Sequence, residues 1–214
     1  MDAITDNSIT QSRDSQSRLA TADCITMLQE GNKRFIENKS INRDLHAQVK
    51  ETATGQYPYA AVVSCIDSRI PTEVIFDQGI GDIFNARIAG NFVNEDILGS
   101  LEFACKLAGS KLIVIMGHTS CGAVKGACDD AKLGNLTNML AHITPSVEAV
   151  KTPEGVERSS KNLDFVNQVA IENVIRTIQK VKDRSPVLNE MFEDKQIDIV
   201  GAMYDVKSGN VNFL

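Results

Sequence analysis

Two short apolar runs in the middle of the chain have the pattern of buried strands. Residues 59–64 read Tyr-Ala-Ala-Val-Val-Ser, and residues 111–117 read Lys-Leu-Ile-Val-Ile-Met-Gly. Both are short and rich in β-branched side chains, and neither alternates between apolar and polar residues as a half-exposed strand would. Strands are also predicted at 82–87 and 197–204, with a short return strand at 211–214 after a polar turn.

Helical patterns separate these strands. The segment after Asn94 has a polar cap, an acidic first turn and an apolar face that ends at Gly109, and residues 163–182 form the longest amphipathic pattern. Further helices are predicted at 21–36 with an interruption near Gly31, 45–51, 72–76, 122–132 and 136–143. The alternation of strand, helix and strand predicts an α/β fold with a mainly parallel sheet and right-handed crossovers.

The chain is expected to form one domain, residues 21–214, preceded by a flexible arm, residues 1–20. A length of 214 residues fits a single domain with a substantial core. The first 20 residues are rich in Ser, Asp, Gln and Thr and lack apolar periodicity, which is typical of a mobile segment or one that lies on a partner.

Composition and charge exclude several classes of protein. With 43% hydrophobic and 23% charged residues, the chain has an ordinary globular composition, and no apolar run approaches the ~18 residues that span a bilayer. A net charge of −6 without a stripe of Lys and Arg argues against a nucleic-acid partner. The start has no basic region followed by an apolar one, so we expect a cytoplasmic protein, or a periplasmic one if a signal peptide had been removed.

Five cysteines, an odd number without dense spacing, favour a reducing compartment in which some thiols bind metal or act in catalysis. Three of them fall in predicted helices and are interpreted as buried structural residues: Cys24, Cys105 and Cys128.

The other two cysteines lie with a histidine at the ends of predicted strands. Cys65 closes the first apolar run, and His118 and Cys121 follow the second. If the two strands are parallel neighbours, the three side chains meet at the carboxyl edge of the sheet, where open α/β folds bind ligands. Zinc prefers tetrahedral Cys and His ligands, and a site with three protein ligands keeps one position for water, as catalytic sites do. We therefore expect one Zn²⁺ at this edge.

Asp67 and Arg69 follow Cys65 at spacings that place the three side chains on one side of an extended segment. A carboxylate beside a zinc site can accept the hydrogen of the nucleophile, and a guanidinium can hold that carboxylate in place. Alternatively, Asp67 is the fourth ligand and closes the site. The sequence leaves both arrangements open.

The same residue types also occur in two other kinds of site. A Cys-His nucleophile, with Cys121 or Cys65 attacking a carbonyl and His118 as base, leaves the second cysteine without a role. A phosphate-binding loop would use Gly117 and Gly122 as its outer glycines, but the required Lys and Ser or Thr do not follow them.

The segments Ser64-Cys-Ile-Asp-Ser-Arg and Gly117-His-Thr-Ser-Cys-Gly resemble the two signature motifs of the β-class carbonic anhydrases, and the resemblance extends from about Ala22 to the carboxyl end. It implies a zinc enzyme that interconverts carbon dioxide and bicarbonate. It also implies about four parallel strands with an antiparallel C-terminal edge strand, and an N-terminal helical arm. Such proteins are homo-oligomers, dimers or dimers of dimers, with the active site at the dimer interface.

The resemblance also assigns roles to individual residues. It implies that Cys65, His118 and Cys121 are zinc ligands and that Asp67 and Arg69 form the catalytic dyad.

Three further residues resemble the substrate-binding positions of the family. Gln56 resembles a glutamine that binds substrate, Phe84 resembles the aromatic wall of the pocket, and Gly122 would place a backbone N–H near the substrate. Phe103 stands where some members have a tyrosine.

Two other functions remain as alternatives. The same zinc site could hydrolyse carbonyl sulfide or carbon disulfide, which share the linear triatomic shape of carbon dioxide. The chain could also be an inactive zinc-binding oligomer.

Overall fold

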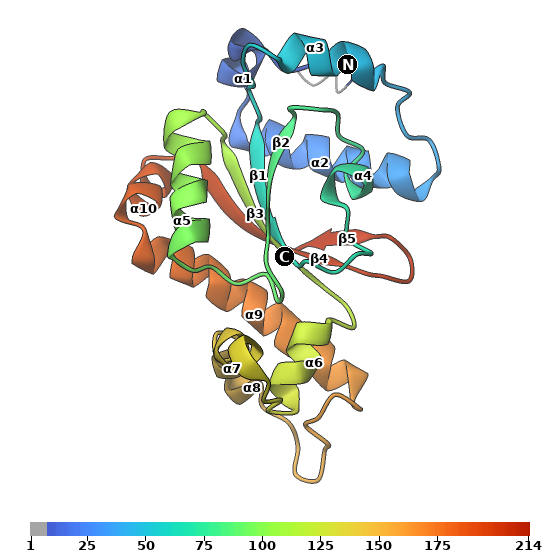
Figure 1. Cartoon of the computed structure of the whole chain (residues 1–214), viewed down its shortest axis with the longest axis vertical. Coiled ribbons are helices and arrows are strands. Elements are labelled where there is room, and N and C mark those ends of the chain that lie inside the picture. The colour runs from blue at the N-terminus through green and yellow to red at the C-terminus, as the bar shows by residue number, and fades with distance from the viewer. Residues whose placement is uncertain (1–7) are drawn as a thin grey trace.

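A five-stranded sheet forms the centre of the protein in this computed structural model, which describes residues 8–214 (Figure 1). The strands are β1 (Ala60–Ser64), β2 (Ile83–Arg87), β3 (Leu112–His118), β4 (Asp198–Tyr204) and β5 (Val211–Phe213). Their order is β2-β1-β3-β4-β5; β5 pairs antiparallel with β4, and the other neighbours are parallel. The predicted mainly parallel sheet with an antiparallel C-terminal edge strand is confirmed.

The register of β1 against β3 decides where the cysteines lie. Val63 pairs with Ile115, so Cys65 follows two residues later at the level of Gly117. The end of β1 therefore lies beside the segment that carries His118 and Cys121. The sequence predicted this neighbourhood on the condition that the two strands are parallel neighbours, and β1 and β3 do pair in parallel.

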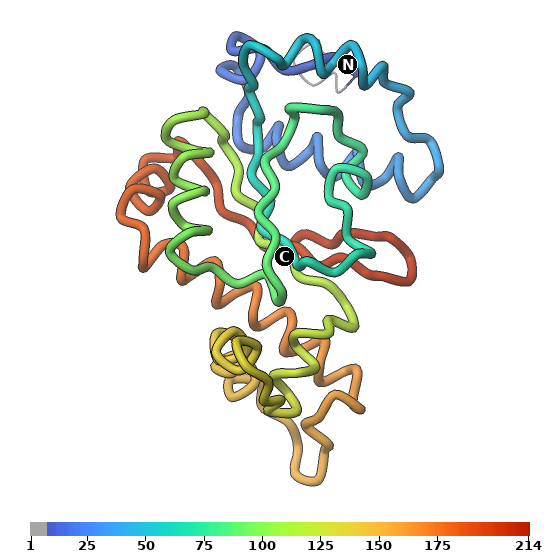
Figure 2. Tube along the Cα trace, in the orientation of Figure 1, coloured from blue at the N-terminus to red at the C-terminus, as the bar shows by residue number. Residues whose placement is uncertain are grey.

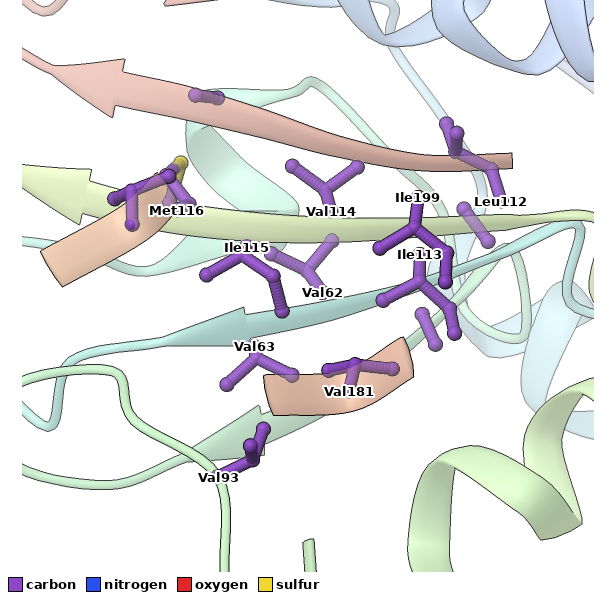
Figure 3. Packing of buried hydrophobic residues seen from close by; sticks show 14 of the residues in the cluster. Val62, Val63, Val93, Leu112, Ile113, Val114, Ile115, Met116, Val181 and Ile199 are labelled. Carbon is purple, nitrogen blue, oxygen red and sulfur yellow. The ribbon is translucent and has the colours of Figure 1, made fainter. Parts of the chain in front are cut away.

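Burial of both central strands explains their unbroken apolar pattern. Every residue of β1 and of β3 is buried. Figure 3 shows Val62 and Val63 beside Val114 and Ile115, with Val181 of a long helix packed near them. A strand covered on both faces reads as a continuous hydrophobic run.

Helices gather beyond the two ends of the sheet and along it (Figures 1 and 2). The group α1 to α3 lies near one end, and α6 to α8 lie beyond the other. The helices of the described residues are α1 (Arg13–Arg18), α2 (Thr21–Ile36), α3 (Leu45–Thr52), α4 (Thr72–Ile75), α5 (Glu95–Glu102), the π-helical η1 (Phe103–Leu107), α6 (Gly122–Cys128), α7 (Gly134–Leu140), α8 (Thr144–Ala149), α9 (Leu163–Arg184) and α10 (Pro186–Glu193).

The long helix α9 packs against β3 and β4. Glycines allow this close approach, because a Cβ built at Gly117 would lie 2.7 Å from Val174, and one at Gly201 would lie 2.8 Å from Val174. No helix within residues 8–214 is long and apolar enough to cross a bilayer.

The predicted interruption of α2 at Gly31 is wrong, because the helix continues to Ile36. A Cβ at Gly31 would lie 1.8 Å from the carbonyl oxygen of Phe76. The glycine therefore allows α2 to touch the end of α4, and it does not break the helix.

No helix is predicted before Thr21, yet Arg13–Arg18 form α1. Ser12 caps it in a capping box with Ser15. The buried Gln16 donates from Nε2 to the carbonyl oxygens of Pro58 (2.8 Å) and Ala108 (2.9 Å). This part of the expected flexible arm is thus anchored to the domain; residues 1–7 lie outside the described residues, and contact with a partner stays a prediction.

Two short helices, α8 and α10, were not predicted. Each has a proline within its first two residues, a position that suits the missing N–H of proline. Ser185 also caps α10, its Oγ accepting from the backbone N–H of Leu188. The prolines and Ser185 were visible in the sequence. The two helices are only 6 and 8 residues long, too short for a clear apolar periodicity.

Candidate metal centre

Cys65, His118 and Cys121 converge at the carboxyl edge of the sheet, as the strand topology predicted. Their ligand atoms all lie within 4.8 Å of one another, and all three side chains are buried. The two Sγ atoms are 4.0 Å apart. Two sulfurs bound to one tetrahedral zinc ion would be ~3.8 Å apart, since each Zn–S bond is ~2.3 Å long. The donor set and its spacing therefore fit zinc.

The imidazole of His118 is oriented for metal binding. Its Nδ1 lies 3.0 Å from the carbonyl oxygen of Thr119, which can only accept, so Nδ1 carries the proton. Its Nε2 is buried and has no hydrogen-bond partner among the described residues. Buried polar atoms are almost always satisfied, and a metal ion would satisfy this one.

The two thiols interact strongly. The pKa of Cys65 is lowered to about 4, chiefly because the Cys121 thiol donates to its sulfur, and the N–H of Gly90 donates to the same sulfur at 3.4 Å. The pKa of Cys121 is raised, because a second thiolate would lie buried beside the first. The pair alone favours one negative charge, and a divalent cation would stabilise both thiolates.

Local backbone geometry presents Cys121 to the cluster. Ser120 has a left-handed conformation with φ of 57°. Its N–H donates to Oδ1 of Asn167 at 2.9 Å. Cys121 then forms the N-cap of α6, with Gly122 as the first helical residue.

Asp67 and Arg69 form a two-bond ion pair beside this cluster. Arg69 donates from Nε to Oδ1 (2.9 Å) and from Nη2 to Oδ2 (2.7 Å), and its backbone N–H also reaches Oδ1 (3.0 Å). These bonds hold the pKa of Asp67 well below its usual range and raise that of Arg69. Asp67 is not part of the three-residue ligand group found among the described residues. In this structure, Arg69 engages both carboxylate oxygens of Asp67.

Arg87 also contacts the backbone at this cluster, a contact that the sequence did not predict. It donates from Nε to the carbonyl oxygen of Cys65 (3.0 Å) and from Nη2 to that of Asp67 (2.6 Å). In the sheet register, Arg87 pairs with Ser64, the residue before Cys65, and this pairing places Arg87 beside the cluster. Arg87 fixes the backbone that carries both Cys65 and Asp67.

The three predicted substrate-binding residues do not all lie near the cluster. Gly122 adjoins Cys121 at the exposed start of α6. Gln56 is exposed and precedes β1, so the whole strand separates it from Cys65. Phe84 pairs with Ala61, four residues before Cys65, which corresponds to ~13 Å along a strand.

Phe84 instead lines a separate hollow of about 630 Å³. Its ring meets that of Phe103 edge to face, with centroids 6.2 Å apart. Phe103 is 51% exposed, and Leu107 on the same π-helix is 76% exposed. Within one chain, this aromatic wall and the ligand cluster are distinct.

Comparisons with known proteins agree with this geometry. The family model described as carbonic anhydrase matches residues 60–211. Carbonic anhydrase 2 of Mycobacterium tuberculosis is 34% identical over 186 residues, covering 85% of this chain and 87% of the relative. A carbonic anhydrase of Mycolicibacterium smegmatis is 32% identical over 190 residues, covering 86% and 88%.

Solved structures show the same fold. The β-carbonic anhydrase CafA of Aspergillus fumigatus superposes with a TM-score of 0.68 at 25% identity, covering 89% of this chain and 90% of that one. A β-carbonic anhydrase of Sordaria macrospora, described as tetrameric, gives a TM-score of 0.66 at 24% identity, covering 79% and 90%. With its ligand cluster, its sheet order and these relatives, the chain belongs to the carbonic anhydrase family, in the β class.

Proposed function

We propose that this protein catalyses the reversible hydration of carbon dioxide to bicarbonate and a proton, with one zinc ion per subunit. The observation that carries the proposal is the buried cluster of Cys65, His118 and Cys121, whose unpartnered Nε2 and paired sulfurs face one another beside Asp67. Zinc bound there would supply a nucleophile at neutral pH by making water more acidic.

The residues beside the cluster would orient the reaction. Asp67 stays ionised because Arg69 binds both of its oxygens. Oδ1 accepts two bonds and Oδ2 accepts one, so Oδ2 keeps a free lone pair. Asp67 can therefore accept the hydrogen of the nucleophile and fix its direction. The exposed backbone N–H of Gly122, at the first turn of α6, can donate to a substrate oxygen.

We further propose that a second copy of the chain completes the pocket. Gln56 and Phe84 lie away from the cluster of their own chain. Exposed Phe103 lines the same hollow as Phe84, and exposed Leu107 lies on the same π-helix as Phe103. A homo-oligomer could place this aromatic hollow against the ligand edge of its neighbour. Its apolar wall would hold carbon dioxide, and the Gln56 amide would bind its oxygen.

The test combines metal analysis of the purified protein with stopped-flow hydration of carbon dioxide. We expect about one zinc per chain and rapid turnover in the wild type. Cys65→Ala should lose both, because two remaining ligands hold zinc poorly. Cys128→Ala is the matched control, since this half-buried thiol lies outside the cluster.

Three other outcomes would contradict the ligand set or the proposed activity. A metal-replete, active Cys65→Ala protein would refute the ligand set. Turnover of carbonyl sulfide or carbon disulfide without turnover of carbon dioxide would assign the hydrolase activity. Bound zinc with turnover of none of these would indicate a zinc-binding oligomer without catalysis.

A further inference from the structure

Two asparagines of α9 form hydrogen bonds with backbone groups next to the two cysteines of the cluster. Asn173 donates from Nδ2 to the carbonyl oxygen of Gly90 at 2.8 Å. Asn167 accepts at Oδ1 from the N–H of Ser120 at 2.9 Å. Gly90 in turn donates its N–H to Sγ of Cys65, and Ser120 directly precedes Cys121. One helix is thus linked to both sulfur ligands.

The backbone partners fix the direction of each bond. A carbonyl oxygen can only accept, so the amide nitrogen of Asn173 must face Gly90. A backbone N–H can only donate, so the amide oxygen of Asn167 must face Ser120. The two asparagines therefore play opposite roles, one as a donor and one as an acceptor.

The surrounding residues leave little room at Gly90, whose N–H contacts the sulfur of Cys65. It has φ of +80°, and a Cβ built on it would lie 2.4 Å from Cδ1 of Ile143. Asn173 is 1% exposed, and its Oδ1 lies 3.4 Å from Oγ of Ser146 on α8. Asn173 therefore holds, from a buried position, the carbonyl of the same residue whose N–H points at Cys65.

We propose that Asn167 and Asn173 are positioning residues that set the two cysteine ligands at metal-binding separation. This proposal rests on the zinc site of the proposed function. Asn173 acts through Gly90, whose N–H stabilises the negative charge on the Cys65 sulfur. Asn167 acts through Ser120, whose left-handed conformation directs Cys121 into the cluster. Hydrogen bonds that orient metal ligands typically change metal affinity 10–100-fold when removed.

The opposite roles allow a crossed experiment with one kind of substitution. Asn167→Asp keeps an acceptor for Ser120, so its zinc affinity should stay within about threefold of the wild type. Asn173→Asp at pH 8 removes the donor and points a carboxylate at a carbonyl, so zinc should bind 10–100-fold more weakly. Zinc affinity is measured by competition with a chromophoric chelator, and amide hydrogen exchange of Gly90 should accelerate only in the Asn173 variant.

Alanine variants keep the test decisive if a buried charge prevents folding. Asn167→Ala and Asn173→Ala should each weaken zinc binding 10–100-fold, because each leaves a backbone group without its partner. Thr177→Val is the matched control on the same helix, since the buried Oγ1 of Thr177 has no partner among the described residues, and its zinc affinity should match the wild type.

The outcomes separate the two proposals. Wild-type zinc affinity in both folded alanine variants, with unchanged Gly90 exchange in Asn173→Ala, would overturn the positioning role while the zinc enzyme stands. Failure of the wild type itself to retain zinc would overturn both.

Discussion

At the scale of single residues, the chemistry of Asp67 depends on Arg69. The ion pair holds the pKa of Asp67 below its usual range, so this group is ionised at neutral and mildly acidic pH. Any stability it contributes is present at neutral pH and is lost progressively as the pH falls from the ordinary carboxyl pKa of 3.8 through the lowered pKa of the folded state. A decline of activity between pH 8 and pH 6 would therefore belong to another group.

Asp67→Asn is expected to retain zinc and to lose most of the turnover at neutral pH. The amide oxygen can still accept a bond, but its NH₂ side cannot accept from the nucleophile, and Arg69 loses a charged partner. Stopped-flow hydration and metal analysis measure the two effects separately. Asp130→Asn is a suitable control, because Asp130 is exposed and pairs with Lys132 at the surface. Full turnover of the Asp67 variant would remove this residue from the mechanism.

At the scale of elements, the sequence predicted what depends on burial and chain order. The apolar runs predicted β1 and β3, and their parallel pairing predicted that Cys65 would meet His118 and Cys121. The roles of Asn167 and Asn173 were not predictable, because their contacts to distant backbone depend on how α9 lies on the sheet. Local spacing does not contain that information.

The contact between β3 and α9 predicts the effect of adding one methyl group. Gly117→Ala would place a Cβ 2.7 Å from both Sδ of Met203 and Cγ2 of Val174. Overpacking of this kind typically destabilises by about 1–3 kcal/mol. We expect a lower urea midpoint and weaker zinc binding, because His118 is the next residue.

Gly122→Ala is the matched control for this overpacking. A Cβ at Gly122 meets no described atom within 4 Å. Gly122 also does not have a positive φ, so an alanine can adopt its backbone conformation. Its stability should equal or slightly exceed that of the wild type, since alanine favours helices. Equal urea midpoints for both alanine variants would contradict the packing argument.

At the scale of the whole molecule, the proposed pocket needs two chains while the ligands come from one. Phe103→Glu should therefore lower the oligomer mass and the turnover but leave zinc per chain unchanged. Light scattering, stopped-flow hydration and metal analysis measure these three quantities. Leu133→Glu is the control, because Leu133 is 70% exposed and does not line the hollow. An intact oligomer after Phe103→Glu would place the interface elsewhere.

Asp82 makes the stability of the whole fold depend on pH. Its side chain is 1% exposed; Oδ2 accepts from the N–H of Gly79 at 2.6 Å, and Oδ1 has no partner among the described residues. Burial raises its pKa from 3.8 to about 6. The folded state therefore binds this proton more tightly than the unfolded state, so the Asp82 contribution to stability falls as pH rises through the window from about 4 to 6.

Asp82→Asn removes this dependence while keeping an oxygen acceptor for Gly79. A shift from 3.8 to about 6 corresponds to about 3 kcal/mol, so the stability of the variant relative to the wild type should rise by up to that amount between pH 4 and pH 7. Urea unfolding of both proteins in the same metal state measures this difference, and the titration of the other groups cancels. A difference that stays constant across the window would mean that Asp82 is ionised in the folded protein throughout, which its buried, half-satisfied carboxyl argues against.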